Sequence, residues 1–434
     1  MNREGAWILT IGDELVRGEI TDSNKSFLSE RLLRLDLEST RHLTVGDDPA
    51  AIEEVLRLAA ERASVVLVTG GLGPTRDDIT TEVAARSFGL RLVRDPGVLE
   101  RIQGYFRSVG REMTENNAKQ ADLPEGAELL PNPLGTAPGY MLEQDGTLLC
   151  FMPGVPKELY RMVDQELLPR LESRRAQHGI VRASLWRTFG IGESALDRDL
   201  EDLGRRDPSI TLGFRTQFPD NLVRVVVRAK SDAEARRKLA AAETELRERL
   251  GPLLVGSGDQ RLETIVGELL QKGGLSVAVA ESCTGGLIAS RLTDVPGSSR
   301  YLLAGFVAYS NQAKVRELGV RPEDLDRHGA VSEPVVRRMA EGARERSGAE
   351  LAIATTGIAG PDGGSDEKPV GTLWVGLADA AGTEARRYQL MRERDRNKEL
   401  ATQIALEWLR RRVLGLPLPD ETFPRLRAAS GSGR

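Results

Sequence analysis

The hydrophobic positions in the first third of the chain alternate between two spacings. Residues Ala6–Ile11 and Val65–Thr69 are nearly continuous apolar runs, which are typical of strands buried on both faces of a sheet. Apolar residues recur at helical spacing in three segments, which span residues 26–37, 50–62 and 79–88. This alternation of strands and helices predicts a parallel α/β sheet.

The pattern becomes shorter and more polar after about residue 170. Residues 184–189 and 222–229 are strand-like, whereas residues 194–203 and 232–250 are helix-like. This order predicts a small α+β domain. The glycines and prolines of residues 251–259 are typical of a linker.

A second α/β alternation occupies the rest of the chain. It closes on a helix whose Leu400, Ile404 and Trp408 recur at every fourth position. We therefore predict two α/β sheet domains that are joined by a small α+β domain. The expected bounds are residues 1–170, 171–255 and 256–416, followed by a disordered tail at residues 417–434.

The composition argues against a surface built for polyanions. The 434 residues include 60 basic and 65 acidic side chains, with a net charge of -5, so that any phosphate or nucleic-acid binding has to be local. The two cysteines, Cys150 and Cys283, lack the spacing of a metal site and are typical of a reducing compartment. The N-terminus becomes polar too early for a signal peptide, and no apolar run approaches the ~20 residues that span a bilayer. We therefore expect a cytoplasmic protein without membrane contact.

A glycine-rich loop follows the second buried run of the first domain. Its glycines would let the backbone approach a phosphate, which the first N–H groups of the next helix favour. The candidate phosphate-binding residues are Gly70, Gly71, Gly73, Pro74 and Thr75. Asp77 and Asp78 would face that phosphate through a divalent cation, because hard cations bind carboxylate and phosphate oxygens together. The loop therefore predicts metal-dependent chemistry on a phosphate ester or a pyrophosphate.

Two further loops of the first domain follow strand-like runs. One is Gly12–Glu14, in which Asp13 is a third candidate metal ligand, and the other is Met152–Leu159, with Gly154 and Lys157 as candidate binding residues. Ligands of open α/β sheets collect at the carboxyl ends of strands, where all three loops fall. The alternative is that these loops are tight turns and helix caps whose aspartates complement a helix dipole.

The third domain places hydroxyl groups at a similar junction. Glu281–Gly286 follows an apolar run and precedes a helix-like segment. A serine there would gain N–H donors suited to an oxyanion hole for attack on a carbonyl or amide. Helix capping is the alternative, and the short segment alone favours it. Residues 309–314 and 354–361 follow two other strand-like runs and bring further hydroxyls and a lysine, which favours a catalytic site.

Histidine, the usual general base, is scarce in this chain. The three histidines are His42, His178 and His328, and only His328 lies in the third domain, where it is a candidate base. A lysine can act instead where a buried or cationic setting lowers its pKa. Lys314 is that candidate.

Long motifs occur in a fixed order along the chain: GDEL from residue 12, GGLGPTRDD from 70, MPGVPKEL from 152, AESCTGG from 280, AYSNQAK from 308, HGAVS from 328 and TGIAGPDGG from 356. In this order they resemble the family of the competence/damage-inducible protein CinA. The resemblance implies an N-terminal domain similar to the molybdopterin-binding fold that acts as a metal-dependent ADP-ribose pyrophosphatase. It also implies a C-terminal domain that converts nicotinamide mononucleotide to nicotinic acid mononucleotide and ammonia. The middle domain resembles the KH-like module of the family, but residues 190–193 lack the GXXG loop that clamps nucleotides, so we expect a spacer or a dimer-forming element.

The amidase resemblance implies roles for single residues. Ser282 would be the nucleophile, with Tyr309, Lys314 and Thr356 around it, and Lys314 would act as base either directly or through Tyr309. Cys283 would only pack as a small apolar residue.

The glycines near the nucleophile would contact the substrate. N–H groups near Gly285 and Gly286 would hold the oxyanion, and Gly357 and Gly360 would line the substrate site. Thr284 would be a cap or a binding hydroxyl. Residues 392–398 depart from the pattern of the family, which leaves their role in phosphate binding open.

The resulting hypothesis is a bifunctional, homodimeric enzyme that recycles pyridine nucleotides. Its substrates would be nicotinamide mononucleotide and ADP-ribose. The N-terminal domain would need Mg, Co or Ni, and the amidase domain would need no cofactor. One alternative is a non-enzymatic partner in DNA uptake or recombination, although an acidic chain without a basic, aromatic stripe gives nucleic-acid binding little support. Another alternative is a molybdopterin-binding protein.

Overall fold

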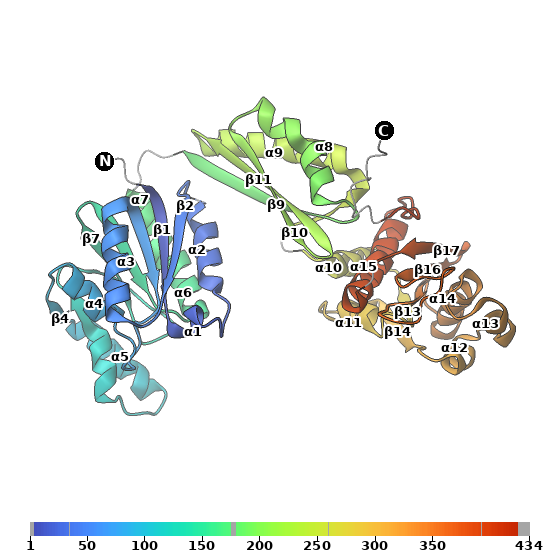
Figure 1. Cartoon of the computed structure of the whole chain (residues 1–434), viewed down its shortest axis with the longest axis horizontal. Coiled ribbons are helices and arrows are strands. Elements are labelled where there is room, and N and C mark those ends of the chain that lie inside the picture. Colours follow the sequence, from blue (N-terminus) through green and yellow to red (C-terminus); the bar gives the residue numbers. More distant parts are fainter. Residues whose placement is uncertain (1–3, 34, 175–178, 259, 392, 424–434) are drawn as a thin grey trace. The chain divides into compact units, whose positions relative to one another are not determined.

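The chain divides into two compact units (Figure 1). The computed structural model describes residues 4–33, 35–174, 179–258, 260–391 and 393–423. The first unit comprises Met1–Arg182 and Arg228–Arg236, and the second comprises Ala183–Val227 and Arg237–Arg434. Most of the middle domain therefore belongs to the same unit as the C-terminal domain.

The first unit is built on a six-stranded sheet in the order β2-β1-β3-β8-β7-β6. These strands are β1 (Glu4–Ile11), β2 (Ser39–Val45), β3 (Ala63–Thr69), β6 (Glu128–Leu130), β7 (Gly139–Gln144) and β8 (Thr147–Met152). Strands β1, β2, β3 and β8 run parallel, whereas β6 and β7 pair antiparallel. A second sheet pairs β4 (Leu92–Arg94) with β5 (Asp122–Pro124).

Helices cover both faces of the large sheet. They are α1 (Asp13–Val16), α2 (Ser23–Leu33), α3 (Pro49–Arg62), α4 (Thr80–Ser87), α5 (Pro96–Ser108), η1 (Glu115–Ala121), α6 (Pro156–Met162), η2 (Val163–Leu167) and α7 (Leu168–Arg174). Trp7 and Leu9 of β1 pack in one core with Leu56 of α3, and Ile8 packs in the other core with Leu28 of α2. Successive residues of β1 thus face opposite cores, which explains its continuous apolar sequence.

Helix α2 begins earlier than the apolar spacing predicts. The spacing predicts a helix over residues 26–37, but α2 spans Ser23–Leu33. The carboxylate of Asp22 accepts the backbone N–H of Lys25 at 3.2 Å. This cap starts the helix ahead of its first apolar residue.

The middle domain contains two strands that the sequence pattern does not predict. Its sheet has the order β10-β11-β9-β12. The elements are β9 (Ile180–Thr188), α8 (Glu193–Arg206), β10 (Ile210–Gln217), β11 (Asp220–Ala229), α9 (Asp232–Leu250), η3 (Gly251–Leu253) and β12 (Leu254–Ser257). Because β12 pairs antiparallel with β9, residues 254–257 belong to the sheet and are not the predicted linker.

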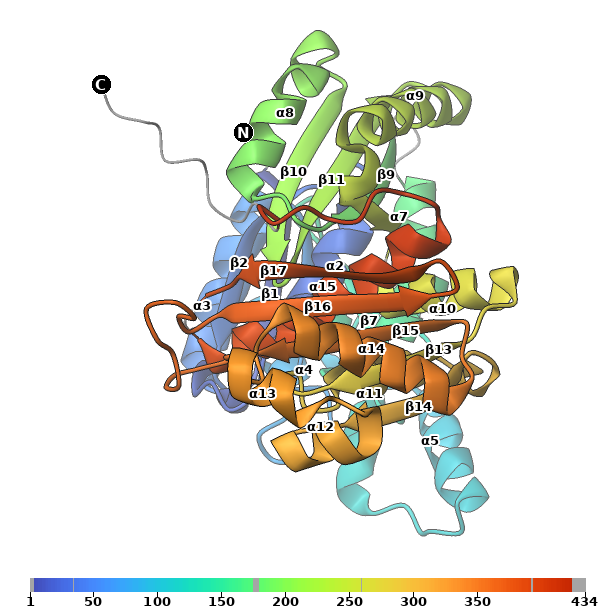
Figure 2. The same cartoon turned by 90° about the vertical axis from the view of Figure 1, so that its right-hand side faces the viewer.

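The C-terminal domain has a five-stranded sheet in the order β14-β13-β15-β16-β17. Its strands are β13 (Val277–Glu281), β14 (Leu302–Val307), β15 (Leu351–Gly357), β16 (Thr372–Asp379) and β17 (Gly382–Gln389). Its helices are α10 (Leu262–Gly273), α11 (Leu287–Thr293), η4 (Ser298–Arg300), α12 (Asn311–Leu318), α13 (Pro322–His328), α14 (Glu333–Ser347) and α15 (Arg394–Val413). One core joins β13 to α10, α11 and α15, and another joins it to α12 and α14, so that helices cover both faces (Figure 2). Leu400, Ile404 and Trp408 all lie in the first of these cores, as their spacing predicts.

The start of the predicted disordered tail packs against the C-terminal domain. Leu418 and Phe423 are buried in the core that contains α15. Arg386 donates to the carbonyl oxygens of Leu418 and Pro419 at 2.8 and 2.6 Å. The prediction of disorder from Pro417 is therefore wrong up to Phe423, and its remainder, residues 424–434, lies outside the described residues.

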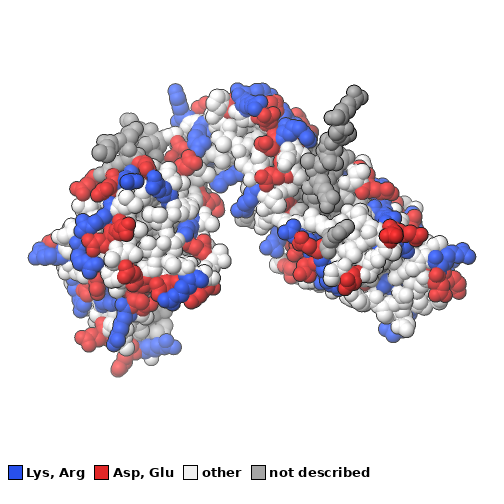
Figure 3. Space-filling model, in the orientation of Figure 1, with Lys and Arg blue, Asp and Glu red and all other residues white. Residues whose placement is uncertain are grey.

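The distribution of charge and the character of the helices bear on the expected partners. Lys and Arg side chains are interspersed with Asp and Glu side chains on the face shown in Figure 3. Among the described helices, none combines the length and the apolar character needed to cross a membrane.

Candidate active sites

Three loops of the C-terminal domain meet at one edge of its sheet. Strands β13, β14 and β15 are parallel neighbours, and Glu281 is in register with Val307 and Thr355. The residues that follow these strands are therefore close in space, as expected for the carboxyl ends of parallel strands. Ser282 follows β13 at this edge.

Ser282 and Lys314 form the chemical centre of this edge. The Nζ atom of Lys314 lies 3.1 Å from the Oγ atom of Ser282, and it donates to the carbonyl oxygens of Ala308 (2.9 Å) and Tyr309 (3.2 Å). The lysine is 1% exposed and Ser282 is 9% exposed. Burial lowers the pKa of Lys314, because the ammonium form loses hydration, and no carboxylate among the described residues forms an ion pair with it. A neutral lysine beside a serine hydroxyl is the arrangement of an activated nucleophile.

The hydroxyl of Tyr309 points away from this pair. Its side chain is 62% exposed, and its Oη atom accepts a hydrogen bond from Arg394 at 3.3 Å. Only the backbone carbonyl of Tyr309 contacts Lys314. The geometry therefore favours direct proton transfer between Ser282 and Lys314 over a route through the phenol.

The other two candidates of this domain are a buried threonine and an exposed histidine. Thr356 is buried, and its hydroxyl donates to the carbonyl of Ala330 at 2.9 Å, which ties β15 to the segment before α14. The side chain of His328 is exposed at the last position of α13. Within the described residues, no hydrogen bond or ion pair joins His328 to Ser282, so the lysine is the better-placed base.

Glu281 is a buried residue whose role the sequence does not reveal. Its carboxylate accepts the N–H groups of Gly286 and Ile288 at 3.0 Å each and that of Ala289 at 2.9 Å. It thus caps α11, with a negative charge that the helix dipole favours. The alternative that a serine or threonine hydroxyl caps this helix is therefore wrong, because the carboxylate of Glu281 accepts these N–H groups and leaves the hydroxyl of Ser282 available.

This cap changes the expected oxyanion site. The N–H of Gly286 is bonded to Glu281, and the N–H of Gly285 donates to the carbonyl of Ser282 at 3.2 Å. The N–H groups of Gly285 and Gly286 themselves therefore both have partners inside the chain, so an oxyanion would have to bind to other N–H groups near these glycines. The backbone N–H groups of Cys283 and Thr284, directly after the nucleophile, have no partner within the described part of the chain. They are the better candidates for an oxyanion hole.

The side chains of Cys283 and Thr284 are packing groups. Burial raises the pKa of Cys283 to about 12, so its thiol stays protonated at neutral pH. Thr284 is fully buried, and its hydroxyl lies 2.9 Å from that of Thr355. The structure therefore does not support the predicted role of Thr284 as a substrate-binding hydroxyl.

The first turn of α15 brings two cationic residues to the serine site. Arg394 donates to the carbonyl of Gly360 at 2.8 Å as well as to Tyr309. A side chain at Gly285 would lie 4.0 Å from the Nζ atom of Lys398. Residues 392–398, whose role the sequence leaves open, therefore contribute positive charge to the serine site through Arg394 and Lys398. Arg392 lies outside the described residues.

Two of the predicted glycines lie close to this site. The carbonyl of Gly360 accepts a hydrogen bond from Arg394. Gly357 is closely packed, since a side chain there would approach the sulfur of Cys283 at 3.1 Å.

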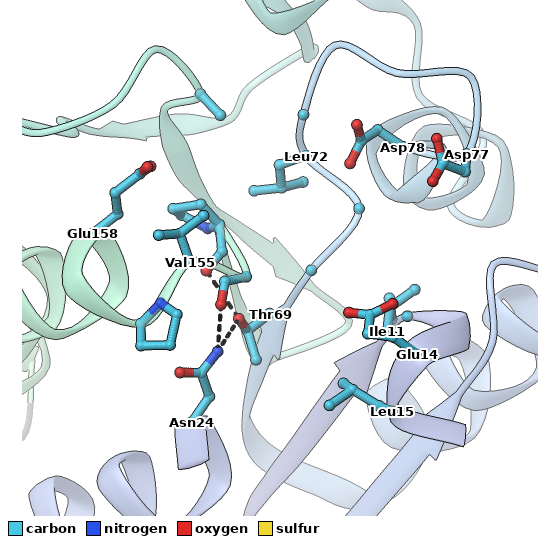
Figure 4. Close-up of a pocket in the computed structure, with 18 of the residues that line it drawn as sticks. Ile11, Glu14, Leu15, Asn24, Thr69, Leu72, Asp77, Asp78, Val155 and Glu158 are labelled. Carbon is cyan, nitrogen blue, oxygen red and sulfur yellow. Dashed lines mark hydrogen bonds between the residues drawn. The ribbon is translucent and has the colours of Figure 1, made fainter. Parts of the chain in front are cut away.

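The first unit contains a pocket of about 510 Å³ at the carboxyl ends of β1, β3 and β8 (Figure 4). The predicted residues that line it are Gly70, Gly71, Gly73, Pro74, Asp77, Asp78 and Gly154. Gly70 has φ of 108°, and a side chain there would overlap the carbonyl of Ile11. The glycine is therefore required by the close approach of two strand ends.

Several carboxylates face this pocket. Figure 4 shows Asp77 and Asp78 on one side and Glu158 on the other, and Glu14 and Asp47 also line it. Burial raises the pKa of Asp47, and the nearby acidic groups raise it further. Such crowding of like charges favours a bound cation. Within the described residues, however, no three metal-ligating side chains converge closely enough to form a site by themselves.

Three predicted residues of this site lie elsewhere. The carboxylate of Asp13 pairs with Arg17 at 2.5 Å and accepts the N–H of Asp47 at 3.2 Å, so it is not directed into the pocket. Its neighbour Glu14 lines the pocket instead. Lys157 is exposed and does not line the pocket. Thr75 acts indirectly, since its N–H (2.9 Å) and hydroxyl (2.5 Å) both donate to Asp78.

A segment that the sequence does not mark supports the glycine-rich loop. Lys119 of η1 donates to the carbonyls of Asp78 (3.1 Å) and Thr75, and Asn116 donates to that of Pro74 at 3.2 Å. Gln120, in the same segment, lines the pocket and has a buried Oε1 atom without a partner among the described residues. No local pattern marks this segment, because its partners lie about forty residues away.

Comparisons with known proteins agree with the three domains. Residues 7–173 match the model of a probable molybdopterin binding domain, residues 184–256 match the damage-inducible protein CinA KH domain, and residues 259–413 match the CinA C-terminal domain. The chain is 45% identical over 406 residues to a CinA-like protein of Geobacter sulfurreducens, covering 94% of this chain and 98% of that protein. It is 41% identical over 416 residues to a putative competence-damage inducible protein of Acetivibrio thermocellus, covering 96% and 100%. The crystal structure of CinA from Thermoplasma acidophilum aligns with 38% of this chain and 96% of that one, at 32% identity and a TM-score of 0.36.

Proposed function

The chain belongs to the CinA family, and from this premise we propose that its C-terminal domain is a serine amidase that converts nicotinamide mononucleotide to nicotinic acid mononucleotide and ammonia. The observation that carries the proposal is the 3.1 Å contact between Ser282 and a buried lysine that has no ion-pair partner among the described residues. Such a lysine is neutral at a lower pH than a free one and can accept the serine proton.

The chemistry follows from these positions. The Oγ atom of Ser282 attacks the carboxamide carbon as Lys314 takes its proton, and the N–H groups of Cys283 and Thr284 stabilise the oxyanion. Lys314 then returns the proton to the leaving nitrogen, so that ammonia departs and an acyl-serine ester remains. Lys314 next deprotonates a water molecule, which attacks the ester carbon. The bond to the Oγ atom of Ser282 then breaks, Lys314 returns its proton to that oxygen, and the carboxylic acid is released.

Positive charge near the serine supports a phosphorylated substrate. Arg394 and Lys398 both lie at this edge, and Arg394 also holds the phenol of Tyr309. A phosphate would complement the two cations, and the exposed Tyr309 ring is suited to contact a pyridine ring.

Ammonia release from nicotinamide mononucleotide, followed with a coupled enzymatic assay, tests this proposal. We expect activity without added metal and none in Ser282→Ala. The variant Cys283→Ala controls for disturbance of the same turn and should retain activity. Full activity of Ser282→Ala would exclude the mechanism.

We propose a second activity, metal-dependent hydrolysis of ADP-ribose to AMP and ribose 5-phosphate, for the N-terminal pocket. It is supported by the glycine-rich loop and by the carboxylates that crowd the same pocket. Asp77 and Asp78 would hold Mg, Co or Ni together with the substrate phosphates, as is usual for hard cations with few protein ligands. The metal would neutralise charge on the pyrophosphate, while the loop glycines admit its oxygens. AMP formation with and without EDTA tests this activity, and tight binding of molybdopterin without ADP-ribose cleavage would favour a molybdopterin-binding protein instead.

A further inference from the structure

The hairpin of β10 and β11 touches the helix that supplies the cations of the serine site. At its tip, the ring of Phe218 lies 5.1 Å from the guanidinium carbon of Arg396 on α15. Asp220, at the start of β11, accepts a hydrogen bond from Gln403 of the same helix at 2.6 Å. The hairpin thus contacts α15 at two points.

The contact through Asp220 is buried and charged. Its second oxygen pairs with Arg187 of β9 at 2.7 Å, and the two side chains are 7% and 9% exposed. Arg187 also donates to the carbonyl of Gln260, just before α10, at 3.1 Å. Because both oxygens of Asp220 are occupied in a buried setting, a shift of the hairpin would leave charges unpaired.

Helix α15 extends from the hairpin contacts to the serine site. Arg394 and Gln403 are nine residues apart, which corresponds to about 14 Å along a helix. The first turn is fixed at its other side by Arg394, which binds Gly360 and Tyr309, and by Asn397, which donates to the carbonyl of Ala359 at 2.9 Å. One rigid element therefore joins the middle domain to the substrate side of the serine.

We propose that the β10–β11 hairpin is a positioning element for the serine site. By holding α15 at Arg396 and Gln403, it sets the position of Arg394 and Lys398 and hence the affinity for the phosphate of the substrate. The link to a phosphorylated amide rests on the proposed amidase function, whereas the link between hairpin and helix does not. The middle domain is thereby a part of the specificity apparatus of the amidase.

Hydrogen exchange of the full-length chain tests the link between hairpin and helix. In Phe218→Ala and in Asp220→Asn, we expect the backbone amides of residues 397–401 to exchange at least about fivefold faster, while those of α14 stay unchanged. Phe218→Ala keeps the buried ion pair and so remains informative if Asp220→Asn fails to fold. Arg249→Ala is the control, because it breaks ion pairs with Asp202 and Glu245 inside the middle domain only. Unchanged exchange in Phe218→Ala would overturn the proposal whatever the substrate is.

Ligand binding in a Ser282→Ala background tests the effect on specificity. By calorimetry, we expect Phe218→Ala to raise the Kd of nicotinamide mononucleotide at least about fivefold and to leave that of nicotinamide riboside within twofold, since only the former carries a phosphate. An equal rise for both ligands would mean that the hairpin merely stabilises the domain, and would overturn the proposal. If the parent chain neither hydrolyses nor binds the nucleotide, the proposed function fails separately. The same comparison is then made with inorganic phosphate, whose unchanged Kd in Phe218→Ala would overturn the hairpin proposal.

Discussion

The two candidate sites lie at the carboxyl ends of strands in two α/β sheets, but they differ in the burial and the charge of their functional side chains. At the serine site, a single cation is buried beside the nucleophile, and burial lowers its pKa. In the N-terminal pocket, acidic side chains face an open cavity, and burial together with the neighbouring carboxylates raises the pKa of Asp47. The carboxyl ends of parallel strands thus determine where a site lies, while burial and charge determine its chemistry.

This difference has a consequence for how each site responds to metal removal. In the proposed amidase the nucleophile and the base are already in contact, so we expect this site to need no metal. The pocket has carboxylates but no converging group of three among the described residues, so the proposed hydrolase would need a cation and a substrate phosphate to complete its site. We therefore expect EDTA to abolish ADP-ribose hydrolysis and to leave ammonia release unchanged.

The largest effect is expected for Ser282→Ala. Loss of the nucleophile should lower kcat/KM for nicotinamide mononucleotide by at least about 10,000-fold, because the acyl-serine route requires this hydroxyl. ADP-ribose hydrolysis by the same variant should stay within about twofold of the parent chain, since the two sites act independently. If both activities fell together, the two sites would not be separate.

Removal of the base should have the next largest effect. Lys314→Met keeps the length of the side chain and should lower kcat/KM by about 1,000-fold. Because burial lowers the pKa of Lys314, the parent activity should fall as the pH drops through this lowered pKa and reach a plateau above it. A pH–rate profile measures this fall of activity at low pH. Lys314→Arg should be inactive at every pH, because a guanidinium stays charged, and an active Lys314→Arg would contradict a proton-accepting role.

The acidic pocket is tested by neutral substitutions. Asp78→Asn and Asp77→Asn should each reduce metal-dependent AMP formation by about 100-fold, since each removes charge at the proposed cation. Lys157→Ala is the matched control and should stay within about twofold, because this exposed lysine does not line the pocket. The reverse order of these effects would show that the phosphate is held by the lysine and not through a cation.

The positions of the sites could be predicted from sequence because parallel strands bring their carboxyl ends together. Ser282 and Lys314 follow two such strands, and the scarcity of histidine points to the lysine as base. The direction of neighbouring side chains could not be predicted. Asp13 pairs with Arg17 and accepts the N–H of Asp47, whereas its neighbour Glu14 lines the pocket. The role of Glu281 was hidden for the same reason, since its sequence position does not reveal which N–H groups it accepts.

Two strands of the middle domain are not predicted from the sequence, because their pairing depends on other strands. Strand β10 has the alternating pattern of a half-buried strand, but it is fixed by its hairpin with β11. Strand β12 is only four residues long and is surrounded by glycines, so that its pairing with β9 leaves little local signal. Phe423 likewise falls in the predicted disordered tail, because its contact with Phe189, at a ring distance of 5.0 Å, joins residues far apart in the sequence.

The smallest effect is expected for substitution of Arg394. It tests whether, within the serine site, substrate binding depends on residues other than the catalytic pair. Arg394→Gln removes a cation but leaves Ser282 and Lys314 in contact, so KM for nicotinamide mononucleotide should rise about tenfold, or roughly 1.4 kcal/mol, with kcat within about twofold. Nicotinamide riboside, which lacks the phosphate, should be hydrolysed with unchanged KM. Glu399→Gln, at an exposed position of the same helix, is the control for a local change of charge. A fall in kcat without a change in KM would place Arg394 in the chemical step, and the separation between a buried catalytic pair and an exposed binding cation would then have to be abandoned.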